Sequence, residues 1–188
     1  MTMEQKPESK ALVEIVEAAP EDVRGMQEVY QETWLETYPD KEAGITREDI
    51  EDFHKDILSE KRLAERAEQV AHPKEGHTIL LAKEGSKVVG VCYLITSGEQ
   101  NRLRSLYVRP GYQGKGVGRK LWAEAKKRLD PGKETMVSVA TYNKKAIDFY
   151  EKLGFRDTGR RFSDERFRMK SGNIIPQMEM KLETHEEQ

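Results

Sequence analysis

The sequence contains a single cysteine, Cys92, so it can form neither an internal disulfide nor a cysteine-based metal cluster. Long hydrophobic runs are also missing, because the longest nearly apolar stretch, residues 88–95, is far too short to cross a bilayer as a helix. The first ten residues lack the apolar core of a secretory signal. These absences predict a cytoplasmic protein that binds no metal and no membrane.

Polar residues dominate the chain, but its apolar residues are clustered rather than scattered. Of 188 residues, 36% are hydrophobic and 35% are charged, and the mean hydropathy is -0.81. This length suffices for one domain with a sizeable core, and the clustering argues against disorder throughout. We expect a single domain over residues 11–182, between an N-terminal tail of residues 1–10 and a C-terminal tail of residues 183–188.

Charge is divided unevenly along the chain. Residues 1–60 hold 17 acidic and 6 basic residues, whereas residues 61–188 hold 17 acidic and 26 basic residues. Residues 101–128 alone contain nine basic residues and one acidic residue. The asymmetry suggests an anionic ligand, such as a phosphorylated cofactor, for the basic stretch and a cationic ligand for the acidic one. Two solvated helix faces of opposite charge are the alternative explanation.

The hydrophobic pattern predicts a mixed α/β fold. Strands are expected at residues 11–19, 77–82, 87–96, 102–108, 135–140, 161–169 and 177–182. Helices are expected at residues 21–37, from 46 to about 58, 117–129 and 143–153. Thr46 and Asp49 have the spacing of a capping box at the start of the second helix. Residues 59–69 either prolong that helix or form a separate one.

A glycine-rich segment separates the expected strand 102–108 from the helix that follows. Glycines at alternate positions allow positive φ and close backbone approach, so backbone N–H groups and the helix N-terminus can hold a diphosphate. The P-loop pattern fails because Lys115 is followed by Gly116 instead of Ser or Thr. The dinucleotide fingerprint fails because Gly116 and Gly118 are one residue too close. The third interpretation is the pyrophosphate loop of an acetyl-CoA-dependent enzyme.

Two segments resemble motifs of the GNAT superfamily of N-acetyltransferases. Residues 113–118, Gln-Gly-Lys-Gly-Val-Gly, are similar to the family's Gln/Arg-x-x-Gly-x-Gly/Ala loop. Residues 143–155 resemble its second motif, with Asn, Ala, Phe-Tyr and Leu-Gly-Phe in that order. The resemblance covers residues 11–182 and implies the GNAT fold, a mostly antiparallel, splayed central sheet with helices on both faces. Residues 34–53 also look like relatives of the polyamine-acetylating type.

The resemblance implies a binding site for acetyl-CoA. The central strand would pair with the pantetheine arm, the loop would hold the pyrophosphate, and Lys115 or Arg119 would meet the 3′-phosphate. A backbone N–H of Tyr107 or Val108 would polarise the acetyl carbonyl, and Asn143 would bond the pantetheine arm. The cofactor-binding residues implied in this way are Leu106, Tyr107, Val108, Gln113, Gly114, Lys115, Gly116, Val117, Gly118, Arg119 and Asn143.

Tyr150 is the catalytic residue that the resemblance implies. Transfer of an acetyl group to an amine expels a thiolate, and a phenol with an ordinary pKa of about 10 can protonate that thiolate at neutral pH. A purely packing role is the alternative, because Tyr150 shares the apolar face of helix 143–153.

The general base is not assigned by any motif. Many relatives place a glutamate on the central strand, but this chain has Arg102 and Arg104 at the matching positions. The candidates that the sequence offers are Glu36, His54 and His77, and an ordinary surface histidine is the alternative for His77.

The acceptor is expected beside the loop between the first two helices, where Trp34 and Tyr38 lie. The acidic residues around this loop favour a primary amine, either a small cationic amine or a polyamine, with a protein amine as an alternative. Trp34 also fits a core position. The sequence therefore predicts direct acetyl transfer in a ternary complex, and a non-catalytic acyl-CoA sensor is the rival.

Two further expectations concern partners. Nucleic-acid binding is disfavoured, because the pI is about 6.2 and few aromatic residues interleave the basic stretch. A homodimer is expected because the family commonly forms one.

Overall fold

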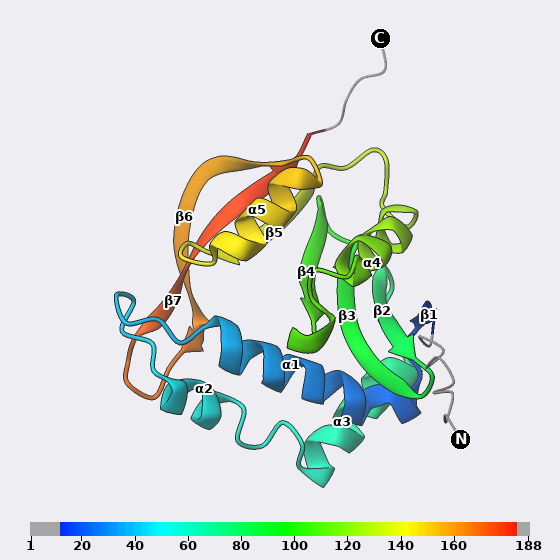
Figure 1. The fold of residues 1–188 in the computed structure, drawn as a ribbon. Coiled ribbons are helices and arrows are strands. Elements are labelled where there is room, and N and C mark those ends of the chain that lie inside the picture. Colours follow the sequence, from blue (N-terminus) through cyan, green and yellow to red (C-terminus); the bar gives the residue numbers. More distant parts are fainter. Residues whose placement is uncertain (1–11, 184–188) are drawn as a thin grey trace, which may run out of the picture.

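The computed structural model describes residues 12–183, which form one seven-stranded sheet with helices on both faces (Figure 1). The strand order is β1-β2-β3-β4-β5-β7-β6, and every neighbouring pair is antiparallel except β4 with β5. The predicted mixed α/β fold with a mostly antiparallel sheet is therefore confirmed. The expected tail at residues 1–10 and all but the first residue of the tail at 183–188 lie outside the described residues.

The strands and helices alternate much as the sequence predicts. The strands are β1 (Val13–Glu17), β2 (His77–Glu84), β3 (Lys87–Ile95), β4 (Asn101–Val108), β5 (Thr135–Ala140), β6 (Phe155–Arg168) and β7 (Ile174–Leu182). The α-helices are α1 (Val23–Thr37), α2 (Arg47–Phe53), α3 (Glu60–Ala71), α4 (Val117–Lys126) and α5 (Lys144–Lys152). Short 3₁₀ turns at Pro20–Asp22 and Pro110–Tyr112 precede α1 and α4.

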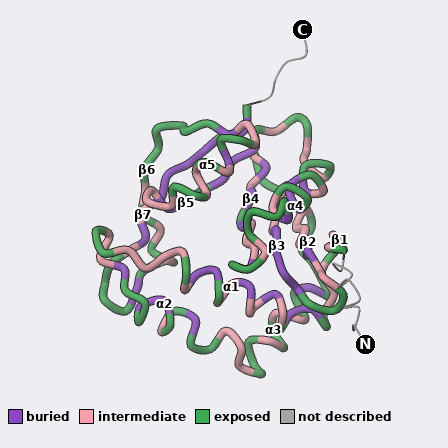
Figure 2. The backbone as a smooth tube through the Cα atoms, viewed as in Figure 1, coloured by how far each residue is buried: buried purple, intermediate pink, exposed green. Residues whose placement is uncertain are grey.

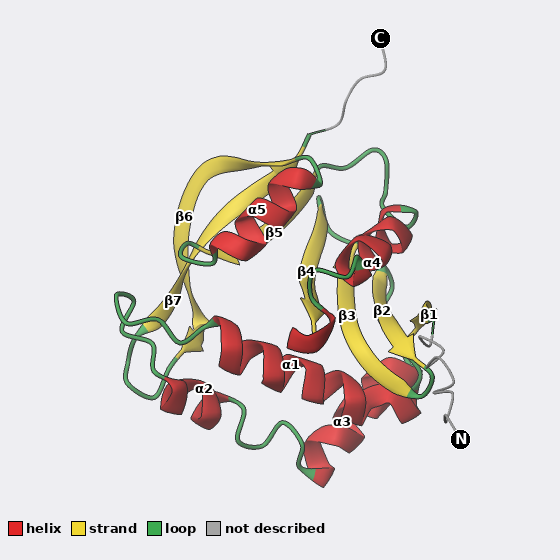
Figure 3. Cartoon of the chain, in the orientation of Figure 1, coloured by secondary structure: helices red, strands yellow, loops and turns green. Residues whose placement is uncertain are grey.

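Strands β4 and β5 separate along their length. Their parallel pairing covers only Asn101–Leu103 against Thr135–Val137. From Arg104 onward β4 has no partner on its β5 side, although it stays paired with β3 as far as Val108. In Figure 3 the two strands meet at one end and diverge toward α1. The expected splay in the central sheet is therefore present, and its open side is a backbone edge.

The helices form two layers over the sheet. Successive residues of β2 point to opposite faces, so Leu80 and Ala82 join the core under α4 and α5 while Leu81 packs toward α1 and α3. A third buried cluster surrounds Trp34 and Ile175 beside β7. Buried residues run through the middle of the sheet and along α1 (Figure 2). The site at the splay thus lies between two well-packed layers.

Local signals explain most element boundaries. At the start of α2 the Asp49 N–H donates to the Thr46 hydroxyl at 3.0 Å, and the Thr46 N–H donates to the Asp49 carboxylate at 2.9 Å, which is the predicted capping box. Residues 59–69 belong to a separate helix, α3, whose N-cap is Ser59.

Four boundaries differ from the prediction by three residues or more. Helix α2 ends at Phe53, not near residue 58, because residues 54–58 form tight turns, and β7 begins at Ile174, not at residue 177. Helix α4 ends at Lys126, not at residue 129, because residues 127–129 continue as tight turns. Strand β6 begins at Phe155, not at residue 161. Its first residues pair with β7 as an exposed edge strand, so they carry charges in place of an alternating apolar pattern.

Candidate active site

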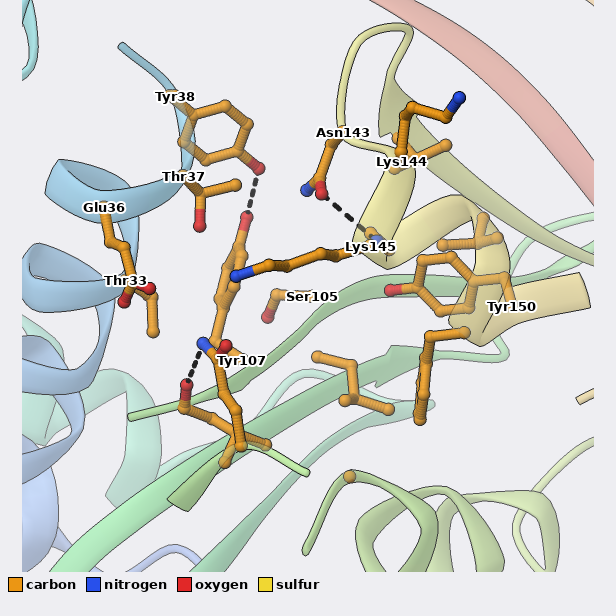
Figure 4. A pocket seen from close by; sticks show the side chains of 18 of the residues that line it. Thr33, Glu36, Thr37, Tyr38, Ser105, Tyr107, Asn143, Lys144, Lys145 and Tyr150 are labelled. Atoms are coloured by element: carbon orange, nitrogen blue, oxygen red, sulfur yellow. Dashed lines mark hydrogen bonds between the residues drawn. The ribbon is translucent and has the colours of Figure 1, made fainter. Parts of the chain in front are cut away.

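The diverging strands open into a cavity of about 580 Å³, which we call the transfer cavity. It runs from the glycine-rich loop, between β4 and α5, to the C-terminal end of α1 (Figure 4). The predicted site residues on its wall are Tyr38, Leu106, Tyr107, Val108, Gln113, Gly114, Gly118, Asn143 and Tyr150. Residue 38, residues 106–118 and residues 143–150, three distant parts of the chain, are therefore brought together.

Other predicted residues do not reach that wall. Lys115 lies over the Tyr112 ring at 5.5 Å, and Val117 is buried in the core under α4. Gly116 and Arg119 also lie off the wall. These four residues therefore lie beside the transfer cavity and not on its wall, and their role in binding a ligand stays a prediction.

The glycine-rich loop has the conformation that its sequence requires. Gly114 and Gly116 have φ values of 73° and 82°, in the left-handed region where a side chain is strained. Gly116 is the N-cap of α4, and no side chain caps the free N–H groups of the first turn. A Cβ on Gly118 would lie 3.2 Å from the Phe149 ring, so this glycine lets α4 pack closely on α5. The uncapped helix N-terminus fits an anionic group such as a pyrophosphate.

Arg109 fixes the place where this loop begins, and the sequence analysis did not single it out. Its side chain is 10% exposed, and its Nε donates to the Val88 carbonyl at 2.8 Å. The guanidinium also pairs with Glu28 at 2.9 Å and with Glu32, both on α1. In the sequence, Glu28 and Glu32 are spaced to share one helix face, which could have indicated a common basic partner. Their spacing does not show that this partner is Arg109.

Tyr150 lies on the α5 side of the transfer cavity. The residue is only 6% exposed, and its ring packs edge-on against Phe149 and Phe155. Its hydroxyl points into the cavity (Figure 4) and hydrogen-bonds to none of the described residues. Burial raises the pKa of this phenol far above its usual 10, so the proton stays on the oxygen at neutral pH. Tyr150 thus combines a buried ring with an available donor.

Asn143 caps the helix that carries Tyr150. Its Oδ1 accepts a hydrogen bond from the Ala146 N–H at 3.1 Å. The amide nitrogen donates to none of the described residues and remains available on the cavity wall.

A group of tyrosines closes the other end of the cavity, and the sequence predicted Tyr38 and Tyr107 in the site but not Tyr30 and Tyr142. The Tyr38 and Tyr107 hydroxyls are 2.9 Å apart, and the Tyr142 hydroxyl donates to the Tyr38 carbonyl at 2.9 Å. Beneath them, Tyr30 and Ser105 share a hydrogen bond of 2.7 Å. Burial raises the pKa of each of these tyrosines, so all four are neutral donors or acceptors at physiological pH.

Of the three candidate bases, only Glu36 lies on the wall of the transfer cavity. His54 is buried against Trp34, with 4.8 Å between ring centroids, and burial lowers its pKa to about 4. His77 bonds the Tyr93 hydroxyl through Nδ1 at 2.6 Å, away from the cavity. Asp40 is a second carboxylate on the wall.

A second, smaller cavity of about 240 Å³ lies on the other side of Tyr107, and we call it the arginine cavity. It shares Tyr38, Arg104, Tyr107 and Ser138 with the transfer cavity, so the two are adjacent. Trp34 lines this cavity and stacks on Phe53, with 5.2 Å between ring centroids. Of the predicted acceptor residues, Tyr38 therefore lines both cavities and Trp34 lines only the arginine cavity.

The chain matches a known protein family in sequence and solved structures in fold. The family model described as "Acetyltransferase (GNAT) domain" matches residues 39–174. The chain belongs to the GNAT acetyltransferase family. This membership confirms the family recognised from the sequence and supports an acyltransferase enzyme.

Several curated relatives are named N-acetyltransferases. The chain is 29% identical over 149 residues to the spermidine N(1)-acetyltransferase of Thermoplasma acidophilum, covering 77% of this chain and 88% of that protein. It is 31% identical over 127 residues to the peptidyl-lysine N-acetyltransferase YjaB of Salmonella typhimurium, covering 67% and 82%. It is 40% identical over 81 residues to the thialysine N-epsilon-acetyltransferase of Sus scrofa, covering 39% and 48%, so this match spans about half of that relative.

Solved structures share the fold. The PaiA N-acetyltransferase of Thermoplasma acidophilum in complex with coenzyme A superposes with a TM-score of 0.71 at 24% identity, covering 92% of this chain and 99% of that one. The YncA structure from Salmonella typhimurium, solved with acetyl-CoA, gives a TM-score of 0.61 at 22% identity, covering 95% and 97%.

No helix among residues 12–183 is long and apolar enough to cross a membrane. Within the same range, no three His, Cys, Asp or Glu side chains cluster in a way that would hold a metal ion.

Proposed function

We propose that this protein transfers the acetyl group of acetyl-CoA directly to a primary amine bound in the same cavity. One observation carries the proposal: a single cavity joins the glycine loop before the uncapped N-terminus of α4, the unpaired edge of β4 and the free Tyr150 hydroxyl. Phosphate groups fit the loop, and an extended pantetheine arm fits a strand edge that has no partner. The relatives named for spermidine, thialysine and peptidyl-lysine support an amine acceptor.

The chain's own residues account for each proton and for the developing charge. Acetyl-CoA supplies the acetyl group as a thioester, whose carbon–sulfur bond breaks as the amine nitrogen bonds to the carbonyl carbon. A backbone N–H of Tyr107 or Val108 stabilises the negative charge on the carbonyl oxygen. Tyr150 donates its proton to the departing sulfur and regains one through solvent. An ammonium acceptor first releases one proton to solvent, and its nitrogen gives a second proton to Glu36, directly or through water, as the amide forms.

Calorimetric titration with acetyl-CoA tests the cofactor half of this proposal, with ATP as a ligand control. We expect acetyl-CoA and CoA to bind and ATP to bind much more weakly. Gly116→Asp should abolish binding, because it adds a strained side chain and a negative charge at the helix N-terminus. Gly159→Asp is the matched control, because Gly159 has a φ of 83° with open space around it and lies on β6, outside both cavities. If the folded protein bound none of the CoA compounds, the proposed function would be wrong.

A non-catalytic acyl-CoA sensor is the second candidate. The absence of a glutamate on β4, where Arg102 and Arg104 stand, favours it. The available Tyr150 hydroxyl favours the enzyme, because a sensor needs no proton donor at that place. Acetyl-CoA binding without transfer to any of a broad panel of amines would decide for the sensor. A cytoplasmic location and a homodimer stay predictions from the sequence.

A further inference from the structure

The arginine cavity contains more positive charge than its own acids neutralise. Four arginines line it, together with two acidic residues, which leaves a net charge of +2. Asp164 is taken by Arg166, whose Nε lies 3.0 Å from that carboxylate. The lining residues that carry these charges are Arg102, Arg104, Arg160, Arg166, Asp164 and Glu179.

The other acid is shared between two arginines. Glu179 is buried, and its carboxylate lies 3.2 Å from Arg160 and 3.6 Å from Arg102. The Arg104 side chain is exposed and makes no hydrogen bond or ion pair with any residue of the described chain, and it lies at the junction of both cavities. The unneutralised charge is therefore centred on Arg104, next to Tyr107, while Arg102 and Arg160 share the single carboxylate of Glu179.

The groups that this wall offers to a ligand are guanidinium groups. They are donors only, so a ligand that binds them must bring acceptor oxygens. The Trp34 indole also lines the cavity, but its Nε1 is itself buried and offers no exposed donor there.

Acidic residues on the α1 side of the transfer cavity are accompanied by basic residues of α5. Glu36 and Asp40 line the cavity near the end of α1, and Figure 4 shows Glu36 on the wall with Tyr107 and Tyr38. Lys144 and Lys145 of α5 line the same cavity. Glu28 and Glu32, which also lie on α1, pair with Arg109 and line neither cavity. The two cavities therefore do not form the acidic surface that a purely cationic acceptor would favour.

From this arrangement we propose that the acceptor is a small primary amine that also carries a carboxylate, as an amino acid does. Its carboxylate is bound by Arg104 and Arg102, and its amine reaches the transfer cavity past Tyr107. A volume of about 240 Å³ suits a group of this size. The inference rests on the proposed function and narrows its acceptor away from polyamines, which have no anionic group.

Matched pairs of acceptors test the inference. Lysine and cadaverine differ only by the carboxylate, as do ornithine and putrescine, and kcat/KM is measured for each with saturating acetyl-CoA. We expect the amino acid to be preferred by about tenfold or more, which is the value of one charge-assisted interaction. Arg104→Gln should lower that ratio by about tenfold, Arg104→Lys should restore part of it, and Arg104→Glu should reverse it.

Arg161→Gln is the control, because Arg161 lies on β6, pairs with Asp157 and lines neither cavity. It should leave the ratio unchanged. Equal kcat/KM values within each pair, or a ratio that Arg104→Glu does not alter, would overturn the inference while N-acetylation itself stands. A preference confined to lysine peptides with acidic neighbours would also overturn it, because the acceptor would then be a protein. No transfer to any amine, with acetyl-CoA bound, would contradict the proposed function as well.

Discussion

The two cavities that meet at Tyr107 have walls of different kinds. At the loop end of the transfer cavity the available groups are the backbone N–H groups of a glycine loop and an uncapped helix. In the arginine cavity the available groups are long side chains from β4 and β6, and from the end of α1. Backbone groups are the same in every residue, so they suit a ligand that a whole family shares. Side chains change with single substitutions, so they suit a ligand that differs between members.

The largest expected effect concerns the transfer cavity and its proposed proton donor, Tyr150. Tyr150→Phe should lower kcat by about 10²- to 10⁴-fold, the usual contribution of a general acid, because the leaving sulfur loses its proton donor. Affinity for acetyl-CoA should stay nearly unchanged, since the ring still fills the same space. Steady-state kinetics and calorimetry measure the two quantities.

Tyr93→Phe is the matched control for this variant. Tyr93 bonds His77 and lies outside both cavities, so its loss should leave kcat nearly unchanged. An unimpaired Tyr150→Phe enzyme would remove Tyr150 from the mechanism and return it to a packing role.

The effect of intermediate size concerns the stability of the fold, which depends on pH through His54 beside Trp34. Burial lowers the folded-state pKa of His54 to about 4 from 6.5, so the unfolded chain takes up the proton first as the pH falls. Stability should therefore decrease as the pH falls from about 6.5 to about 4. By linkage the loss between pH 7 and pH 5 is about 2 kcal/mol of unfolding free energy.

Urea unfolding at the two pH values measures this loss. His54→Phe should remove it, because phenylalanine fills the same place beside Trp34 without titrating. His72→Gln changes an exposed histidine on the C-cap of α3 and should leave the loss intact. An equal pH dependence in all three proteins would mean that His54 is not the group responsible.

The smallest expected effect separates two tasks of Asn143. Asn143→Ala should lower stability by about 1 kcal/mol, because α5 loses its cap. Asn143→Ser should keep most of that stability while lacking the amide donor. If the amide binds the pantetheine arm, both variants should bind acetyl-CoA more weakly, and calorimetry beside urea unfolding distinguishes the outcomes. Unchanged affinity in Asn143→Ser would limit Asn143 to capping.

The parts of the fold and site that the sequence predicted are built from residues that lie close together along the chain. A strand, a glycine loop and a helix follow one another within residues 102–129, so their spacing carries the geometry. The capping box at Thr46 and Asp49 and the cap at Asn143 were visible for the same reason. Local hydrogen bonds need only three residues of spacing, and propensities act over that range.

The arginine cavity was invisible because distant strands bring its wall together. Arg104 on β4 and Arg160 on β6 become neighbours only through the order β4-β5-β7-β6, which no local pattern encodes. The positions of His54 and His77 away from the transfer cavity could not be predicted for a related reason, since burial beside Trp34 and the bond to Tyr93 are tertiary contacts. The ion pairs of Arg109 could not be predicted either, because Glu28 and Glu32 meet it only through the packing of α1 on β4.

The short pairing of β4 with β5 also bears on how the native state opens. Only three residue pairs join the half of the sheet that contains β1 to β4 with the half that contains β5 to β7. Such a seam has few backbone hydrogen bonds to break, so native-state hydrogen exchange should open there before either half unfolds. A ligand bound between β4 and β5 would contact both halves of the sheet and hold them together. At a concentration 100 times its Kd it would add about 2.7 kcal/mol to the stability of the fold.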